Sequence, residues 1–148
     1  MRVSNDEFLF SSGEWLSWYN ASNCLFPKTI PLGRKISDMA LIDKNLFITT
    51  QEAGILIYDI LNEKLLKEYA NSNHKNAAIT GLLAIDHSTV LNFITCPNQI
   101  VSLRFNEELG TLKVIKGVET NSKQIDAKIL HDNFITLFDN KTVSIYKT

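Results

Sequence analysis

Short β-rich runs recur along this sequence at a regular spacing. The tripeptide Phe-Ile-Thr begins at Phe47, Phe93 and Phe134, so successive copies lie 46 and 41 residues apart. Each copy follows an apolar run and a polar turn, and a second turn and another β-rich run come after it. A weaker copy opens the chain at Phe8, 39 residues before Phe47. We interpret the pattern as an internal repeat with a period of 40 to 46 residues.

Each repeat is predicted to fold as short strands separated by turns. The runs are rich in Ile, Val, Phe, Tyr and Thr, and Asp, Asn, Gly or Pro separates them. Many runs are continuously apolar, which is typical of strands that are covered on both faces. Segments 36–69 and 79–115 each contain four such runs, labelled a to d. The stretch 61–69 has a competing interpretation as a short amphipathic helix.

The two ends of the chain hold incomplete repeats. The opening segment contains runs b, c and d, and its run d is expected at 24–26, before Pro27. The final segment, 125–148, contains runs a, b and c. In the aromatic run near the start, strand alternation places Trp15 on one face and Leu16 and Trp18 on the other. Packing between repeats explains these large side chains, and an exposed one would be an anchor for a partner.

A unit of four strands and about 40 to 45 residues has the length of one β-propeller blade. Segment 54–66 resembles the third and fourth strands of a blade in the WD-repeat family. Gly54 opens the third strand, and the pair Tyr58-Asp59 closes it where the family has Trp-Asp. Asn73-His74 stands near the position of the family's Gly-His pair. No repeat contains a true Trp-Asp or Gly-His pair, so the resemblance implies divergent WD-repeat-like blades.

The predicted fold class is therefore all-β, a single partial β-propeller over residues 1–148 with about three and a half four-stranded antiparallel blades. The expected units are a partial blade 6–33, a blade 34–72, a blade 73–120 and a partial blade 121–148. A closed ring needs about four to eight blades. We expect the missing parts to come from a longer chain or from another subunit, and the chain alone to self-associate or aggregate.

Side chains that carry chemistry are scattered through the sequence. His74, His87 and His131 lie more than ten residues apart, without the spacing of a metal site. The sequence contains no Gly-rich phosphate loop, nucleophile elbow or Cys-His arrangement. We therefore expect no enzyme activity, cofactor or metal. Cys24 and Cys96 lie in apolar segments and are expected to be buried free thiols. Aspartates follow the strand ends, where they are expected to cap turns: Asp43, Asp59, Asp86, Asp132 and Asp139.

Charge and hydropathy narrow the possible partners. With 15 Lys and Arg against 16 Asp and Glu, the formal net charge is -1, which gives no general attraction for nucleic acid or for an anionic membrane. No apolar run approaches the roughly 18 residues of a membrane-spanning helix, and the polar N-terminus does not resemble a secretory signal. The expected location is intracellular, in the cytoplasm or the nucleus.

The leading functional hypothesis is a non-catalytic scaffold for protein–protein interaction, which docks other subunits of an intracellular complex. In propellers, the d-to-a and b-to-c loops gather on one face of a rigid scaffold. The residues predicted to bind a partner lie in or beside these loops: Arg34, Gln51, Glu52, Asn73, His74, Asn98, Asn121 and Asp139. Two alternatives remain open, a ligand- or substrate-binding propeller with a site in its channel and a binding domain formed by one closed β-barrel.

Overall fold

The computed structural model describes residues 1–50, 54–70, 79–94, 98–131 and 133–147. Every regular element in these residues is a strand. In chain order, the strands are β1 (Glu7–Ser12), β2 (Trp15–Asn20), β3 (Leu25–Pro31), β4 (Ile36–Ile42), β5 (Asn45–Thr50), β6 (Gly54–Asp59), β7 (Lys64–Ala70), β8 (Ile79–Ala84), β9 (Thr89–Ile94), β10 (Gln99–Asn106), β11 (Thr111–Glu119), β12 (Gln124–Leu130), β13 (Asn133–Phe138) and β14 (Val143–Lys147).

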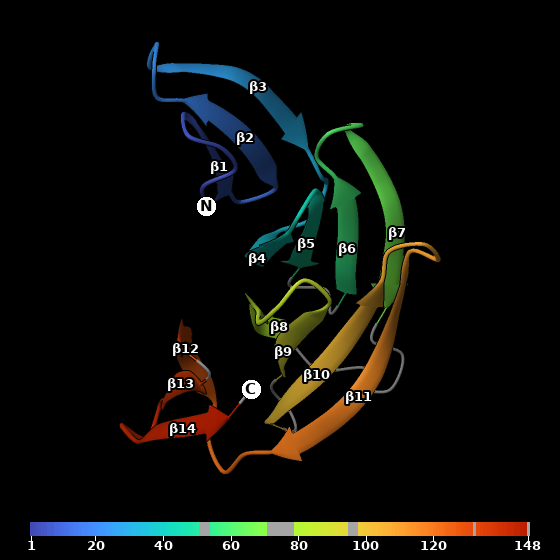
Figure 1. Cartoon of the computed structure of the whole chain (residues 1–148). Helices are drawn as coiled ribbons and strands as arrows, with labels where there is room; N and C mark the ends of the chain where they lie inside the picture. Colours follow the sequence, from blue (N-terminus) through green and yellow to red (C-terminus); the bar gives the residue numbers. More distant parts are fainter. Residues whose placement is uncertain (51–53, 71–78, 95–97, 132, 148) are drawn as a thin grey trace.

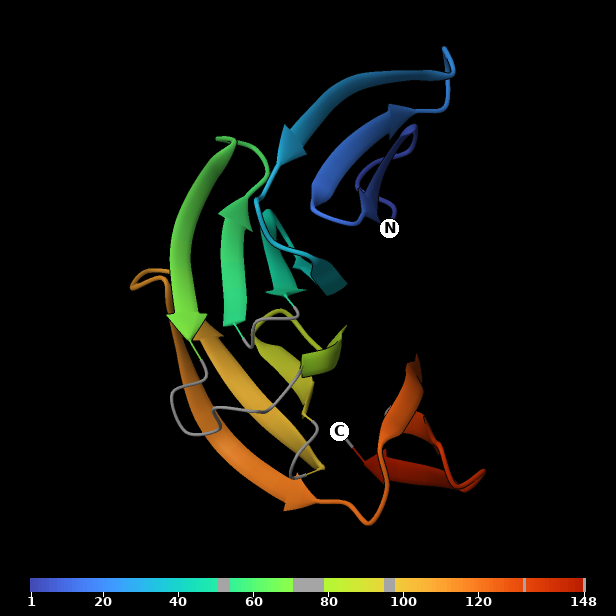
Figure 2. The ribbon, with the colours of Figure 1, turned by 180° about the vertical axis from the view of Figure 1, so that it is seen from behind.

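The strands form antiparallel sheets with the chain order preserved inside each one: sheet 1 is β1-β2-β3, sheet 2 is β4-β5-β6-β7, sheet 3 is β8-β9-β10-β11 and sheet 4 is β12-β13-β14. Figures 1 and 2 show the sheets side by side along an arc that is open on one side, with β4 and β8 near its inside and β7 and β11 near its outside. The predicted all-β blade architecture is confirmed. The closed-barrel alternative is wrong, because the described strands pair in four separate sheets.

The first residue of each copy, Phe47, Phe93 or Phe134, lies on the second strand of a sheet, but the three do not occupy equivalent positions. Phe47 and Phe93 pack in clusters with the following sheet, whereas Phe134 packs against the preceding sheet. The structural period is marked instead by a register shift in the first strand of sheets 2, 3 and 4, at Ile36, Ile79 and Gln124. Because β5 and most of β9 are buried on both faces, an apolar triplet fits there in either register.

Sheet 1 corrects two sequence predictions. Its outer strand β3 continues through Pro27 to Pro31, and the partner strand has a register shift between Trp18 and Asn20. Proline is tolerated there because β3 is an edge strand beside an irregularity. Cys24 is exposed rather than buried, because it lies in the β2–β3 turn with a φ of 56°. Cys96 lies outside the described residues.

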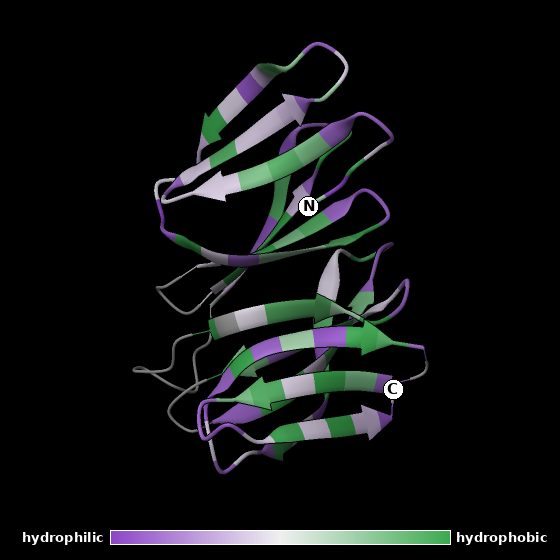
Figure 3. Cartoon of the chain, turned by 90° about the vertical axis from the view of Figure 1, so that its left-hand side faces the viewer, coloured by the Kyte–Doolittle hydropathy of each residue, from purple (hydrophilic) through white to green (hydrophobic). Residues whose placement is uncertain are grey.

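Most of the stretch 61–69, for which a short helix was the alternative, is also a strand. Residues 64–70 form β7, which pairs antiparallel with β6, so the helical alternative is wrong. Figure 3 shows the resulting pattern over the chain, with apolar residues along the strands and polar residues at the turns.

The core lies between the sheets. One cluster joins sheets 2 and 3, a second joins sheets 1 and 2, and a third, smaller cluster joins sheets 3 and 4. All six residues of β5 and all six of β6 are buried, because sheet 2 has a neighbour on each side. Fully burying one large apolar side chain contributes about 1.5–3 kcal/mol, so the packing between sheets is the main source of stability.

Candidate protein-docking surfaces

The b-to-c and d-to-a loops meet on one side of the sheets. Thr120, at the end of the strand pair β10–β11, donates its backbone N–H to the carbonyl of Asn98 at 2.9 Å. In sheet 4 the N–H of Asp139 donates to the carbonyl of Lys123 at 3.0 Å. We call the described part of these loops, residues 13–14, 32–35, 98, 120–123 and 139–142, the loop face. Backbone hydrogen bonds between its loops hold them in fixed relative positions.

The predicted partner-binding residues divide into two groups. Asn98 is half-buried, and Asn121 and Asp139 are exposed, all on the loop face. Arg34 also belongs to the loop face, but its guanidinium forms an ion pair with Glu68 of β7. The other four predicted residues lie outside the described part of the chain: Gln51, Glu52, Asn73 and His74.

Two aspartates cap turns on the other side of the sheets, as the sequence predicts. Asp59 Oδ1 accepts the backbone N–H groups of Leu61 and Asn62, both at 2.9 Å. The hydrogen bonds from Asn62 lower the pKa of the Asp59 carboxyl because they stabilise its charged form. Burial alone would raise the pKa of Asp86, but hydrogen bonds from the residues that follow it outweigh burial and lower that pKa.

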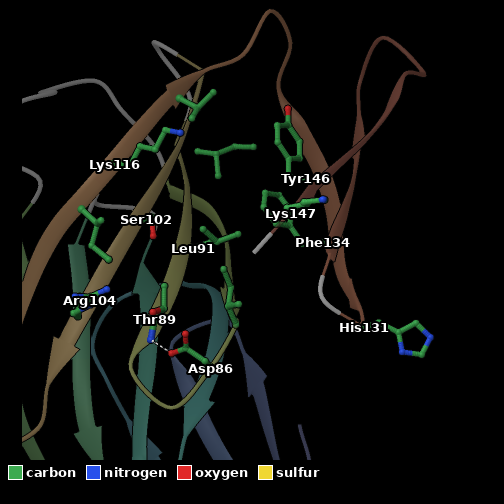
Figure 4. Close-up of a pocket in the computed structure, with 14 residues that line it drawn as sticks. Asp86, Thr89, Leu91, Ser102, Arg104, Lys116, His131, Phe134, Tyr146 and Lys147 are labelled. Atoms are coloured by element: carbon green, nitrogen blue, oxygen red, sulfur yellow. Dashed lines mark hydrogen bonds between the residues drawn. The ribbon is translucent and has the colours of Figure 1, made fainter.

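A cavity of about 610 Å³ lies between sheets 3 and 4 (Figure 4). Apolar side chains from both sheets line it, among them Leu91 and Phe134. Three cationic side chains, Arg104, Lys116 and Lys147, also contribute to its wall. The gap is wide because sheet 4 has three strands where sheet 3 has four, so β11 has no strand of sheet 4 opposite it. The sequence does not predict this cavity, and its one signal there is the incomplete final repeat.

Metal ligands do not gather in the described residues: their His, Cys, Asp and Glu side chains form no group of three that could hold an ion. A search of the same residues finds no helix long and apolar enough to cross a membrane.

Sheet 1 presents an uncovered aromatic face at one end of the arc. Leu16 and Trp18 point into the cluster shared with sheet 2, so alternation directs Trp15 to the opposite face, where it is 50% exposed. The sequence prediction of opposite faces for these residues is therefore confirmed. Ring contacts tie further members of this face together, with the Tyr19 centroid 6.1 Å from that of Phe10 and 5.1 Å from that of Phe26. We call Phe8, Phe10, Trp15, Tyr19 and Phe26 the aromatic end face.

Sheet 4 presents an uncovered aliphatic face at the other end. Phe134 and Tyr146 pack toward sheet 3, so their strand neighbours point away from it. Ile145 pairs with Ile135 and is 68% exposed. Val143 pairs with Leu137, and their exposed fractions are 61% and 39%. We call Ile135, Leu137, Val143 and Ile145 the aliphatic end face.

Comparison with known proteins supports the same architecture. No family model and no curated protein matches the sequence. Among solved structures, U3-55K aligns with a TM-score of 0.77 at 12% identity, over 97% of this chain and 46% of that one. BamB from Moraxella catarrhalis aligns with a TM-score of 0.74 at 10% identity, over 99% of this chain and 42% of that one. The β-propeller domain of Cps50 (Swd1) from Myceliophteria thermophila aligns with a TM-score of 0.70 at 10% identity, over 96% and 48%.

These alignments establish the class of fold. The chain has the fold of part of a β-propeller, which confirms the predicted blades. It spans less than half the length of each of these three structures.

Proposed function

We propose that the chain is a non-catalytic protein-interaction scaffold, a propeller segment on which other subunits of an intracellular complex dock. The observation that carries this proposal is the loop face, where polar loops from different strand pairs are tied together by the Asn98–Thr120 and Lys123–Asp139 backbone hydrogen bonds. Loops held on a rigid scaffold are the usual location of binding residues. The blade boundaries 6–33, 34–72, 73–120 and 121–148 are part of the same proposal.

The chemistry of the loop face favours a polar, protein-sized partner. Exposed Lys35, Lys123 and Asp139 carry both signs of charge, and the amide of Asn121 is both a donor and an acceptor. Mixed charges and amides are typical of the polar rim of protein interfaces. Because the buried strands below hold these loops, binding requires little ordering of the scaffold itself, and this lowers the entropic cost of association.

A quantitative copurification experiment tests the proposal. The tagged chain is purified from its native cells, and the recovered subunits are measured by mass spectrometry. The triple change Asn98→Ala, Asn121→Ala and Asp139→Ala should lower the recovery of a docked subunit by about tenfold, the effect of losing roughly 1.4 kcal/mol. Full recovery with the triple variant would exclude the loop face as the docking surface.

The matched control is the pair Glu107→Ala and Glu108→Ala. These glutamates are exposed in the β10–β11 turn. This turn joins the third and fourth strands of sheet 3, and in an antiparallel sheet it lies at the opposite end from the b-to-c and d-to-a loops of the loop face. Recovery should be unchanged in this variant. Cross-links from the docked subunit are expected at Lys35 and Lys123 rather than at Lys44 of the β4–β5 turn.

The cavity between sheets 3 and 4 favours a second candidate function, binding of a small ligand. Its volume of about 610 Å³ lies in the range of small-molecule sites. The combination of apolar walls with Arg104, Lys116 and Lys147 suits an anionic ligand that has an apolar part. Dodecyl phosphate is a suitable probe, and it should raise the melting temperature of the chain. The change Arg104→Gln should reduce that shift, and an unchanged melting temperature with the probe would exclude this candidate.

A further inference from the structure

The two end faces occupy the same positions in their sheets as residues that are buried elsewhere in the arc. Counted from the first residue pair of each hairpin, Ile145 in sheet 4 is equivalent to Ile57 in sheet 2. Ile57 is fully buried against sheet 3, whereas Ile145 is 68% exposed. Phe10 in sheet 1 is likewise equivalent to Ile48, which is fully buried against sheet 1 while Phe10 is 48% exposed. The end faces are therefore sheet-packing surfaces without a neighbouring sheet.

The size of the arc indicates what covers them. The chain aligns over 48% of the length of a single β-propeller domain, and its four sheets leave one side of the arc open (Figure 1). A second arc of the same size has the length needed to close the ring.

We propose that two copies of the chain form one closed propeller ring. The two copies are related by a two-fold axis that runs along the central axis of the ring. This rotation places the aliphatic end face of each copy against the aromatic end face of the other. Both junctions form at once, and neither copy keeps an uncovered end face. The contact joins two different faces, and two copies of it complete the ring. A dimer therefore forms instead of an open fibre.

The chemistry and size of the faces fit this pairing. None of the five aromatic-end-face residues is charged, so the aromatic side of each junction is desolvated without burying a charge. Beside the aliphatic end face, β12 contributes one residue of each charge, Asp126 paired with Leu137 and Lys128 paired with Ile135. A large aromatic side chain buries about 150–250 Å², so five partly exposed rings contribute on the order of 500 Å² per copy. With the aliphatic face added, the buried area approaches the roughly 800 Å² per partner of stable complexes. The proposal is independent of the loop face, because it uses other surfaces.

The first test is the mass of the chain in solution, measured by native mass spectrometry and by light scattering after size exclusion. The expected mass is twice the 16.8 kDa of one chain. The single changes Ile145→Glu and Phe10→Lys should each weaken the dimer by at least about a hundredfold, because a charge then faces an apolar surface. The matched control is Leu61→Glu, since Leu61 is 73% exposed in the β6–β7 turn and belongs to neither end face.

Mixing the two variants tests the pairing of the faces directly. An equimolar mixture of Ile145→Glu and Phe10→Lys should regain a dimer that contains one copy of each. One of its junctions is fully wild type, and the other places a carboxylate against an ammonium. Misfolded variants would not regain a dimer on mixing, so rescue separates a broken interface from a broken fold.

A cysteine variant gives an independent measurement should either charged variant fail to fold. With Cys24→Ser and Cys96→Ser as background, the double change Phe10→Cys and Ile145→Cys puts one thiol on each end face. Because the two faces lie at opposite ends of one arc, a disulfide between them should join two copies. A wild-type mass of one chain, or of three or more, would overturn the proposal, as would dimers that survive both charged variants, lack of rescue on mixing, or no cross-linked dimer.

Discussion

Strands β5 and β13 are the second strands of sheets 2 and 4, and both begin with an asparagine followed by apolar residues. All six residues of β5 are buried, whereas exposure alternates along β13, where Leu137 is 39% exposed. Their sequences are similarly apolar, so the difference arises from the neighbours. Sheet 2 lies between two sheets, while sheet 4 has a neighbour on one face. An end sheet of this arc is therefore built like an inner sheet that lacks one partner.

The largest expected difference between these regions is for the equivalent isoleucines. Ile57→Ala should lower the free energy of unfolding by about 2–5 kcal/mol, because it creates a cavity in the core between sheets 2 and 3. Ile145→Ala should lower it by less than about 1 kcal/mol at protein concentrations where the chain is monomeric, since little buried contact is lost. Urea unfolding of both variants provides the measurement. Equal losses at low concentration would contradict the distinction between inner and end sheets.

A hydrogen-bonded link between sheets gives the next effect. The Tyr69 hydroxyl on β7 donates to the carbonyl of Gly110 in the β10–β11 turn at 3.0 Å and accepts the N–H of Leu112 on β11 at 2.9 Å. Tyr69→Phe should cost about 1–3 kcal/mol of unfolding free energy, because it leaves the Leu112 donor without its partner. Tyr146→Phe is the control at the junction of sheets 3 and 4. Its stacking on Phe134, with ring centroids 4.7 Å apart, survives the change, so thermal unfolding should be little altered.

The turn cap of sheet 2 predicts a pH-dependent difference. The pKa of the Asp59 carboxyl is lowered from its ordinary value of 3.8, mainly by hydrogen bonds from Asn62. A lowered folded-state pKa stabilises the fold at pH values above 3.8, and this contribution is lost as the pH falls through the folded-state pKa. Asp59→Asn should therefore lower the melting temperature at neutral pH, and the gap to wild type should shrink in acid. A gap that is constant with pH would contradict this role. The position equivalent to Asp59 in sheet 4 is Lys147, and sheet 4 should lack this dependence.

The smallest effect is expected for a salt bridge between an end sheet and an inner sheet. Lys28 of sheet 1 lies 2.5 Å from a carboxylate oxygen of Glu63, whose side chain is 59% exposed in the β6–β7 turn. Glu63→Gln should lower the free energy of unfolding by less than about 1 kcal/mol. The loss should become smaller in high salt, where exposed charges are screened. Thermal unfolding at two ionic strengths measures it, and a loss that grows with salt would contradict the assignment.

Much of this fold follows from the sequence, because strand signals are local. Apolar runs, turn residues and the period predict the strands, their order in each sheet and the incomplete sheets at both ends. The caps at Asp59 and Asp86 follow from the preference of aspartate for turns. The continuation of β3 through Pro27 does not follow, since only the edge position of that strand makes proline acceptable. The exposure of Cys24 depends likewise on the turn that the chain makes there.

The candidate surfaces divide in the same way. Alternation along single strands places Trp15 opposite Leu16 and Trp18, and the loops can be assigned from strand order. The cavity beside Arg104 cannot be predicted, because it joins side chains from strands far apart in the chain. The tripeptide repeat marks the second strands correctly, yet it does not reveal that Phe134 faces the preceding sheet rather than the next one. The register of a strand decides which neighbouring sheet each side chain packs against, and a strand that is buried on both faces accepts either register.

By itself, therefore, the sequence determines a series of four-stranded units with a strand missing at each end, because the pattern of apolar runs and turns is encoded residue by residue. Only the tertiary structure decides which faces of those units are covered. Ile57 and Ile145 are the same residue type in equivalent positions, and one is buried while the other is exposed. The physical reason is that burial depends on the presence of a neighbouring sheet, which no single strand encodes.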